Sequence, residues 1–305
     1  MTTHHIDPTV VYNTFGAHPP ALRVAPGDTV VLQTLDALGF DRKNKERGER
    51  PNPQTGPVWV EGAEPGDALE VRIVRLSPSR PGGWTYGPLA VNVLDPDRVR
   101  TLPARDRFEW LIDAEAGDVR LAAPPPSLAA MTLPFEPMVG CFGVAPAAGE
   151  AIATSTSARH GGNMDWRGFC PGTTVWFPVG VPGALFSAGD GHARQGDGEI
   201  GGTGVETSME MEFRLDLRKD WPIRWPRGIT ADGRDLFTVG NARPLDQALQ
   251  HATTEMLAWL ETGFGYDVYA AGHLISQAVT FDIGNVFNPA YTVVCRMPRD
   301  VVERE

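Results

Sequence analysis

The side chains that could do chemistry gather in one glycine-rich segment, GDGHARQGDGEIGGT, which holds Asp190, His192, Gln195, Asp197 and Glu199. Carboxylates and an imidazole this close together in a folded site need a cation, a shared proton or solvent to offset their repulsion. In an extended chain alternate side chains share a face, so Asp190 and His192 point together. The glycines between them leave room for a ligand to approach. The segment therefore predicts a catalytic or metal-binding edge.

This set of residue types suits a divalent ion such as zinc, manganese or calcium. It also suits metal-assisted hydrolysis, in which the ion activates water and a spare carboxylate moves the proton. The alternative is a pair of glycine-rich turns in which Asp190 and Asp197 bond only local backbone groups. The density of such residues favours the functional interpretation.

A second polar cluster lies upstream, in the segment RHGGNMDW. His160 is a candidate substrate contact, Asn163 a candidate for orienting the substrate, and Asp165 a candidate metal ligand. The alternative is a Gly-Gly turn capped by a polar side chain. Trp166 could wall a small pocket, or it could belong to the core. Asp36, at the end of an early strand, is a further candidate ligand, with an ordinary turn residue as its alternative.

The composition limits the class of protein. The chain has 305 residues, of which 42% are hydrophobic, so it can bury a large core. Its net charge of -11 and its lack of a basic stripe argue against nucleic acid as a partner. Three distant cysteines fit reduced thiols in the cytoplasm. The N-terminus does not resemble a secretory signal, and no apolar run approaches the ~20 residues that span a bilayer. We therefore expect a cytoplasmic protein that binds neither nucleic acid nor membrane.

Turn signals followed by alternating apolar residues recur along the chain and predict β-strands. Pro-Gly precedes such runs at 25–35, 64–76 and 170–181. Further strands are expected at 118–122, 206–217 and 291–297. Helices are expected late, over 245–263 and 267–280. The prediction is a β-rich α+β fold, a large antiparallel β-structure with sandwich or barrel-like layers and a few mainly C-terminal helices.

Two parts are expected along the chain: a β-rich N-terminal part, 1–135, and a site-bearing part with the late helices, 136–305. A proline-rich connector, APPPSLAAMTLPF, ends the first part, and the two parts are expected to pack intimately. The segment 41–57 is charged and poor in apolar residues. It is predicted to be a mobile surface loop, suited to serve as a lid or an oligomer arm.

The motif GGNMD, followed by PGTTVWFPVGVPGALFSAGDGHARQGDGE, resembles the acetamidase/formamidase family in residue order and spacing. The stretches HPPALRVAPGDTV, EGAEPGDALEVRI and HLISQAVTFDIGN resemble that family too, so the resemblance covers almost the whole chain. It implies a β-rich, homo-oligomeric enzyme (a dimer or tetramer) with a bound divalent metal. It also implies hydrolysis of a small amide such as formamide or acetamide to ammonia and the acid. The site it implies consists of Asn163, Asp165, Asp190, His192, Gln195, Asp197 and Glu199.

The resulting hypothesis is a metal-dependent hydrolase of small linear amides, with zinc as the first choice of ion and calcium or manganese as alternatives. The expected metal ligands are His192, Asp190, Asp165 and Asp36. The expected proton acceptors are Glu199 and Asp197. Asn163 and Gln195 are expected to hold the amide or stabilise the oxyanion. His160 and Trp166 are the expected further substrate contacts.

Other interpretations make different demands on the sequence. Serine–lysine and nitrilase-type amidases need a buried lysine, and Lys43, Lys45 and Lys219 all lie in polar or charged contexts. A rival from another class is a metal-stabilised β-protein that binds a small polar ligand without turning it over, since a structural calcium site also uses clustered oxygens. His192 distinguishes the two, because a structural calcium site has little use for an imidazole.

Overall fold

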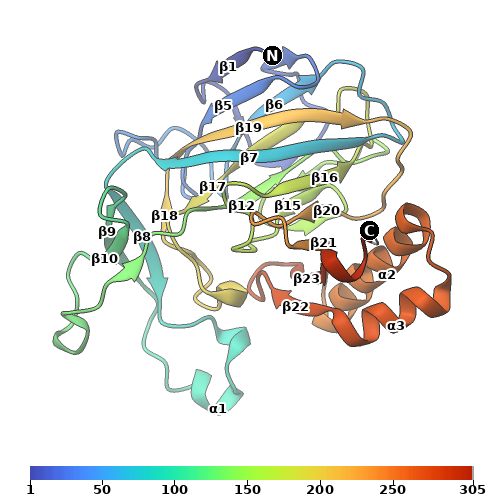
Figure 1. Ribbon diagram of the computed structural model, residues 1–305. Helices are drawn as coiled ribbons and strands as arrows, with labels where there is room; N and C mark the ends of the chain where they lie inside the picture. Colours follow the sequence, from blue (N-terminus) through green and yellow to red (C-terminus); the bar gives the residue numbers. More distant parts are fainter. Residues whose placement is uncertain (304–305) are drawn as a thin grey trace.

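Two large β-sheets, packed face to face, form the body of the computed structural model, which describes residues 1–303 (Figure 1). The first sheet has nine strands in the order β1-β5-β19-β7-β16-β20-β21-β23-β22. Only its β1–β5 pair is parallel among these described strands. The bounds are β1 (Thr3–Ile6), β5 (Thr29–Gln33), β7 (Ala68–Pro78), β16 (Thr174–Pro178), β19 (Met209–Arg218), β20 (Arg227–Ile229), β21 (Asp235–Ala242), β22 (Thr280–Ile283) and β23 (Tyr291–Pro298).

The second sheet has twelve strands, nine of them in the order β11-β10-β9-β8-β18-β17-β12-β15-β14, with β6 beside β17 and β2 and β4 beside β6. Their bounds are β2 (Val11–Tyr12), β4 (Leu22–Val24), β6 (Gln54–Val60), β8 (Gly82–Gly87), β9 (Asp106–Asp113), β10 (Asp118–Leu121), β11 (Leu133–Pro134), β12 (Met138–Gly143), β14 (Ser157–Ala158), β15 (Gly161–Asn163), β17 (Phe186–His192) and β18 (Glu206–Thr207). A separate ribbon pairs β3 (Thr14–Phe15) with β13 (Ile152–Ala153).

The alternation of apolar residues explains why the sheets pack as a sandwich. Along β19, Met209, Met211 and Phe213 are fully buried, whereas the residues between them are only half-buried. Alternate side chains of a strand face opposite sides, so this pattern directs one face inward. There Phe213 meets Phe142 and Phe186 of the second sheet in one continuous core. The predicted β-rich fold is confirmed.

The helices cover the outer face of the first sheet near the C-terminus (Figure 1). They are α2 (Leu245–Phe264) and α3 (Val268–Ala278), and the predictions of helices over 245–263 and 267–280 are confirmed. Helix α2 buries Ala248, Ala252 and Met256 against that sheet. It ends at Gly265, which takes the left-handed conformation that glycine favours, rather than at Gly263. Among residues 1–303, no helix is long and apolar enough to cross a bilayer.

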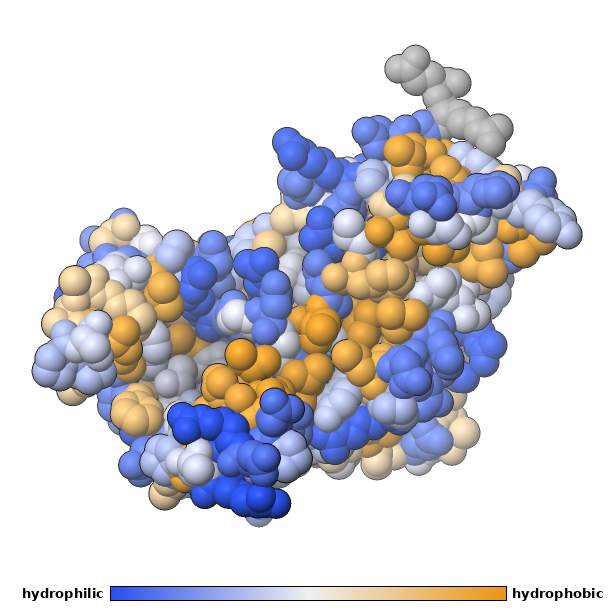
Figure 2. All heavy atoms as spheres, turned by 90° about the horizontal axis from the view of Figure 1, so that it is seen from below, coloured by the Kyte–Doolittle hydropathy of each residue, from blue (hydrophilic) through white to orange (hydrophobic). Residues whose placement is uncertain are grey.

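An arm formed by β8, β9, β10 and the short helix α1 (Pro96–Val99) projects from the body (Figure 1). Its own small core includes Trp110, Ile112 and Val119. Seen from below, hydrophobic side chains gather across the middle of the molecule's face (Figure 2). Both sheets combine strands from 1–135 and 136–305, for example β7 beside β16 and β8 beside β18, so the two expected parts interleave. Their boundary stays a prediction.

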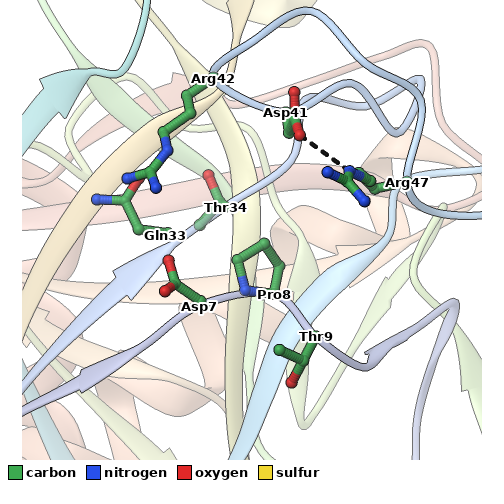
Figure 3. A pocket seen from close by; sticks show the side chains of 8 residues that line it. All are labelled: Asp7, Pro8, Thr9, Gln33, Thr34, Asp41, Arg42 and Arg47. Carbon is green, nitrogen blue, oxygen red and sulfur yellow. Dashed lines mark hydrogen bonds and ion pairs between the residues drawn. The ribbon is translucent and has the colours of Figure 1, made fainter.

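The charged segment 41–57 differs from its prediction as a single surface loop. Its last residues already belong to β6, because the chain from Gln54 onward pairs with β2 and β17. The earlier part folds around Asp41, whose carboxylate accepts hydrogen bonds from the backbone of Lys43 and Lys45 and pairs with Arg47 at 3.1 Å. This part borders a hollow of about 450 Å³ (Figure 3).

Candidate active site

Strand β17 places the centre of the candidate site, because Asp190 and His192 lie at its end with the spacing that puts both on one face. The neighbouring strand β18 brings Glu206 directly opposite His192. On the other side, β12 pairs with β15, after which the chain turns and delivers Asp165. A short 3₁₀ turn, Asp197–Glu199, supplies Glu199. One imidazole and four carboxylates therefore converge from four segments of the chain.

The five groups form one buried cluster. His192 Nε2 lies 3.3 Å from Asp190 Oδ1 and 3.1 Å from Glu206 Oε1. The ligand atoms of Asp165, Asp190 and His192 all lie within 4.8 Å of one another, and so do those of His192, Glu199 and Glu206. None of the five residues is more than 6% exposed. The imidazole thus joins two overlapping groups that have the spacing of metal ligands.

Unsatisfied oxygens in the cluster test whether a cation fits these residues. Among residues 1–303, Asp165 Oδ1, Glu199 Oε2 and Glu206 Oε2 are buried without a hydrogen-bond partner. Burying an unpaired carboxylate oxygen is costly unless a charge or a donor compensates it. Gly140 keeps the space open, because a Cβ there would lie 2.6 Å from Asp165 Oδ1 and 2.7 Å from Asp190 Oδ2. Carboxylate oxygens with one imidazole fit a divalent cation.

The electrostatics of the cluster follow from its burial. Burial raises the pKa of Asp165 and of Glu206 well above the usual range, and that of Glu199 to about 7. Burial also acts on Asp190, but the adjacent His192 outweighs it and lowers the pKa of that carboxyl. The pKa of His192 is raised well above its usual value, because Glu206 and Asp190 outweigh desolvation. Burial thus favours the protonated form of three of the four acids, and His192 favours the ionised form of Asp190.

The backbone is strained at this site. Asn52, Asp165, Asp190 and Glu199 all adopt the left-handed conformation, with φ between 45° and 57°. Each such residue costs on the order of 1–3 kcal/mol, and in folded proteins such residues cluster at functional sites. The surrounding sheet thus holds these side chains in orientations that the free chain would avoid.

Gln195 and two asparagines position the charged groups. Gln195 Oε1 lies 2.8 Å from His192 Nδ1, while its Nε2 donates to the backbone oxygens of Asp165 and Gly284. Both ends of this amide are used within the protein, so Gln195 lies behind the imidazole rather than against a substrate. Asn288 Nδ2 donates to Asp165 Oδ2 at 2.6 Å.

Asn52 connects the cluster to Asn163. Its Nδ2 lies 3.0 Å from Asp190 Oδ2 and 2.7 Å from Asn163 Oδ1. Asn163 also borders a cavity above the cluster. Its own Nδ2 donates no hydrogen bond to any part of the chain that the structure describes. Asn163 therefore offers a free donor beside the carboxylates.

A cavity of about 460 Å³ opens above the cluster, and Asp190, Glu199 and Glu206 border it. Its remaining wall is largely apolar and includes Leu38, Trp84, Tyr86 and Phe287. Arg105, from the projecting arm, lies with its guanidinium carbon 5.2 Å from the ring centres of Tyr86 and Phe287. The cavity thus has a polar floor and an aromatic wall with one cation.

Two of the expected acids lie outside the cluster. Asp36 is fully buried but is occupied by an ion pair with Arg80 and by Trp84 Nε1 at 3.0 Å. Asp197 has a side chain that is 53% exposed, and it pairs with Arg167 at 2.6 Å. Their positions in the sequence suggested both, but each carboxylate has its partner outside the cluster.

The two expected substrate contacts also lie elsewhere. His160 borders a different cavity and contacts the ring of Phe15 at 5.0 Å between ring centres. Trp166 is a core residue that packs on Phe169 and Phe237, and its Nε1 donates to Asp282 at 3.0 Å.

The sequence patterns did not identify four further residues of the site: Glu206, Asn52, Asn288 and Arg105. Glu206 begins a strand that was predicted, directly after the glycine-rich segment, which was a usable signal. Asn52 and Asn288 adjoin prolines, which indicated only turns. Arg105 carried no local signal.

Comparisons with known proteins agree with this architecture. The model of the "Acetamidase/Formamidase family" matches residues 98–304. A formamidase of Methylophilus methylotrophus is 24% identical over 295 residues, covering 76% of this chain and 72% of that protein. An acetamidase of Mycolicibacterium smegmatis is 27% identical over 246 residues, covering 63% of this chain and 58% of that protein.

A solved structure matches almost the whole chain. The acetamidase from Yersinia enterocolitica superposes with a TM-score of 0.86 and 31% identity, covering 99% of this chain and 93% of that one. The match confirms the resemblance first seen in the glycine-rich motifs. This chain belongs to the acetamidase/formamidase family.

Proposed function

We propose that this chain, an amidohydrolase by its family, cleaves a small linear amide at the buried cluster around His192 with the help of a divalent metal ion. The observation that carries the proposal is the set of three buried, unpaired carboxylate oxygens around one imidazole at the floor of a cavity. A structural calcium site would also use clustered carboxylates, but it has little use for the imidazole of His192. The relatives named formamidase and acetamidase support a small amide as substrate.

His192, Asp190 and Asp165 are the residues that would hold the ion, and Glu199 and Glu206 form a second group that shares the same imidazole. When bound, a divalent ion supplies Lewis-acid polarisation of the amide carbonyl and lowers the pKa of water. The mixed oxygen and imidazole donors favour zinc, then manganese, over calcium, which prefers oxygen alone.

Glu199 is the proposed proton carrier, because it borders the cavity and its Oε2 has no partner among residues 1–303. It accepts a proton from the attacking water as the oxygen bonds to the carbonyl carbon, and it passes that proton to the nitrogen as the C–N bond breaks. The products are ammonia and a carboxylic acid. Asn163, held by Asn52, donates its free N–H to the amide oxygen as charge develops there.

The volume of the cavity does not restrict the substrate to one size of acyl group. Its volume of about 460 Å³ admits formamide and acetamide as well as larger amides. A single methylene changes binding by only about 1–3 kcal/mol, so discrimination among short amides is expected to be modest.

The homo-oligomer, whether dimer or tetramer, and the cytoplasmic location stay predictions. Exposed apolar side chains on the arm, among them Val91 and Phe108, support association between copies. Light scattering on the purified protein tests the oligomeric state.

Ammonia release from formamide, acetamide and longer amides tests the proposed reaction, with Asp190→Asn as the comparison. We expect turnover by the native protein and loss of turnover in the variant. A native, metal-loaded protein that binds these amides but releases no ammonia would instead support the non-catalytic rival.

A further inference from the structure

A second cavity, of about 640 Å³, lies apart from the amide site. The two are separated by β15: His160 precedes that strand and borders the second cavity, whereas Asn163 at its end borders the first. The wall of the second cavity is apolar in part, with Ile152, Val179 and Ile223. Nothing in the proposed amide hydrolysis uses this space.

An unsatisfied imidazole borders this second cavity. His160 is 3% exposed, and neither of its ring nitrogens has a hydrogen-bond partner among residues 1–303. Burial lowers the pKa of His160 to about 4, so the ring is neutral near pH 7 and carries one N–H donor. Buried polar groups are rarely left unpaired, and a bound acceptor would satisfy this donor.

Two arginines at the same cavity are also unpaired. Arg159 and Arg224 are both exposed residues that border it, and no ion pair joins either to a carboxylate in the described part of the chain. The guanidinium carbon of Arg159 lies 5.7 Å from the centre of the Trp225 ring. That ring stacks on His251, with 4.5 Å between the ring centres. In a chain with a net charge of -11, two free guanidinium groups beside an apolar cavity favour an anionic ligand.

The remaining charge of the cavity limits the kind of anion. Glu150 also borders it, so the excess positive charge is small and a monoanion is favoured over a dianion such as phosphate. Burial of apolar surface against the apolar part of the wall favours a ligand with an apolar body. Arginine matches the planar geometry of a carboxylate through paired hydrogen bonds.

We propose that this second cavity binds a small organic carboxylate, with its charged group between Arg159 and Arg224, its oxygen within reach of His160, and its apolar body against Ile223 and Val179. The site is independent of the proposed amide hydrolysis, because it shares no lining residue with the amide cavity.

Calorimetric titration with benzoate tests the proposal on the full chain. Replacing both Arg159 and Arg224 with Gln should weaken binding by about tenfold or more, because each charge-assisted hydrogen bond contributes more than a neutral one. The control replaces Arg98 in α1 and Arg100 at its C-terminal end, both exposed, with Gln and changes the net charge equally. Benzoate affinity should be unchanged in this control and in Asp190→Asn.

Nitrogen NMR of histidine-labelled protein supplies an independent readout, because benzoate should shift the ring nitrogens of His160, and the shift should be lost in the variant lacking both arginines. Benzyl alcohol, which lacks the charge, should bind more weakly than benzoate. Three results would overturn the proposal: binding that survives removal of both arginines, binding that disappears in Asp190→Asn, or no binding at a level where a Kd of about 1 mM would be seen.

Discussion

His192 Nδ1 and Gln195 Oε1 lie 2.8 Å apart, so the glutamine amide fixes the imidazole from behind. The amide cannot turn freely, because its Nε2 donates to the backbone oxygens of Asp165 and Gly284. When the ring is neutral, the acceptor Gln195 Oε1 keeps the proton on Nδ1. The unprotonated Nε2 then faces the carboxylates. Gln195 thus leaves Nε2 of His192 available to bind a metal ion or a proton.

Gln195→Leu should lower metal affinity or turnover by about 10–100-fold, because it removes the group that orients a ligand imidazole. Steady-state ammonia release and metal titration measure the two effects. Gln250→Leu, on the exposed side of α2, serves as the control and should leave both unchanged. Native metal affinity and turnover in Gln195→Leu would contradict the positioning role.

Gly140→Ala should disrupt the cluster, because the added Cβ would lie 2.6 Å from Asp165 Oδ1 and 2.7 Å from Asp190 Oδ2. We expect turnover to fall about 100-fold through misplaced groups, and stability to fall by about 1–3 kcal/mol. Gly272→Ala is the matched control, because a Cβ there meets open space on α3. That control should gain up to about 1 kcal/mol. A fully active Gly140→Ala protein would show that the space between the aspartates is not needed.

Glu199→Gln should remain folded and lose about 10²–10⁴-fold in turnover, because it can no longer accept a proton. Asp197→Asn, two residues away, should retain nearly full activity, because its exposed carboxylate pairs with Arg167 outside the cluster. Circular dichroism establishes folding, and ammonia release gives the rates. The opposite ranking would return the proton-carrying role to Asp197.

His160 should make the protein less stable in acid. The pKa of its imidazole is about 4 in the folded protein and 6.5 in the unfolded chain. Above pH 6.5 the ring is therefore neutral in both the folded and the unfolded state, and His160 does not reduce stability. As pH falls from 6.5 to 4, the unfolded chain takes up a proton that the folded state excludes, which costs up to about 3 kcal/mol. Below pH 4 the loss stays constant.

Urea unfolding in carboxylate-free buffers measures this dependence. His160→Gln should reduce the slope of stability against pH between 4 and 6.5, whereas His273→Gln, on an exposed position of α3, provides the comparison. An unchanged slope in His160→Gln would show that another group controls the acid transition.

Much of the fold could be predicted because its signals are local. Pro-Gly turns followed by alternating apolar residues indicated β5, β7 and β16, and helical spacing indicated α2. The order of strands could not be predicted, since β8 pairs with β18 across more than a hundred residues of chain. The spacing of apolar residues within one segment does not indicate which distant strand that segment pairs with.

The candidate site shows the same division. Asp190 and His192 stand two residues apart, so one strand was enough to suggest their shared face. Glu206 and Asn52 reach the site from other segments, and only the packed sheets show it. Asp36 had the right residue type, but the ion pair with Arg80 that occupies it comes from a distant turn.

In the proposed reaction, amide hydrolysis requires a divalent ion held by the cluster around His192. Elemental analysis of the purified protein, followed by chelation and measurement of ammonia release, tests this requirement. We predict about one divalent ion per cluster, loss of turnover on chelation, and recovery on adding zinc back. Undiminished turnover by protein shown to be free of metal would contradict this requirement.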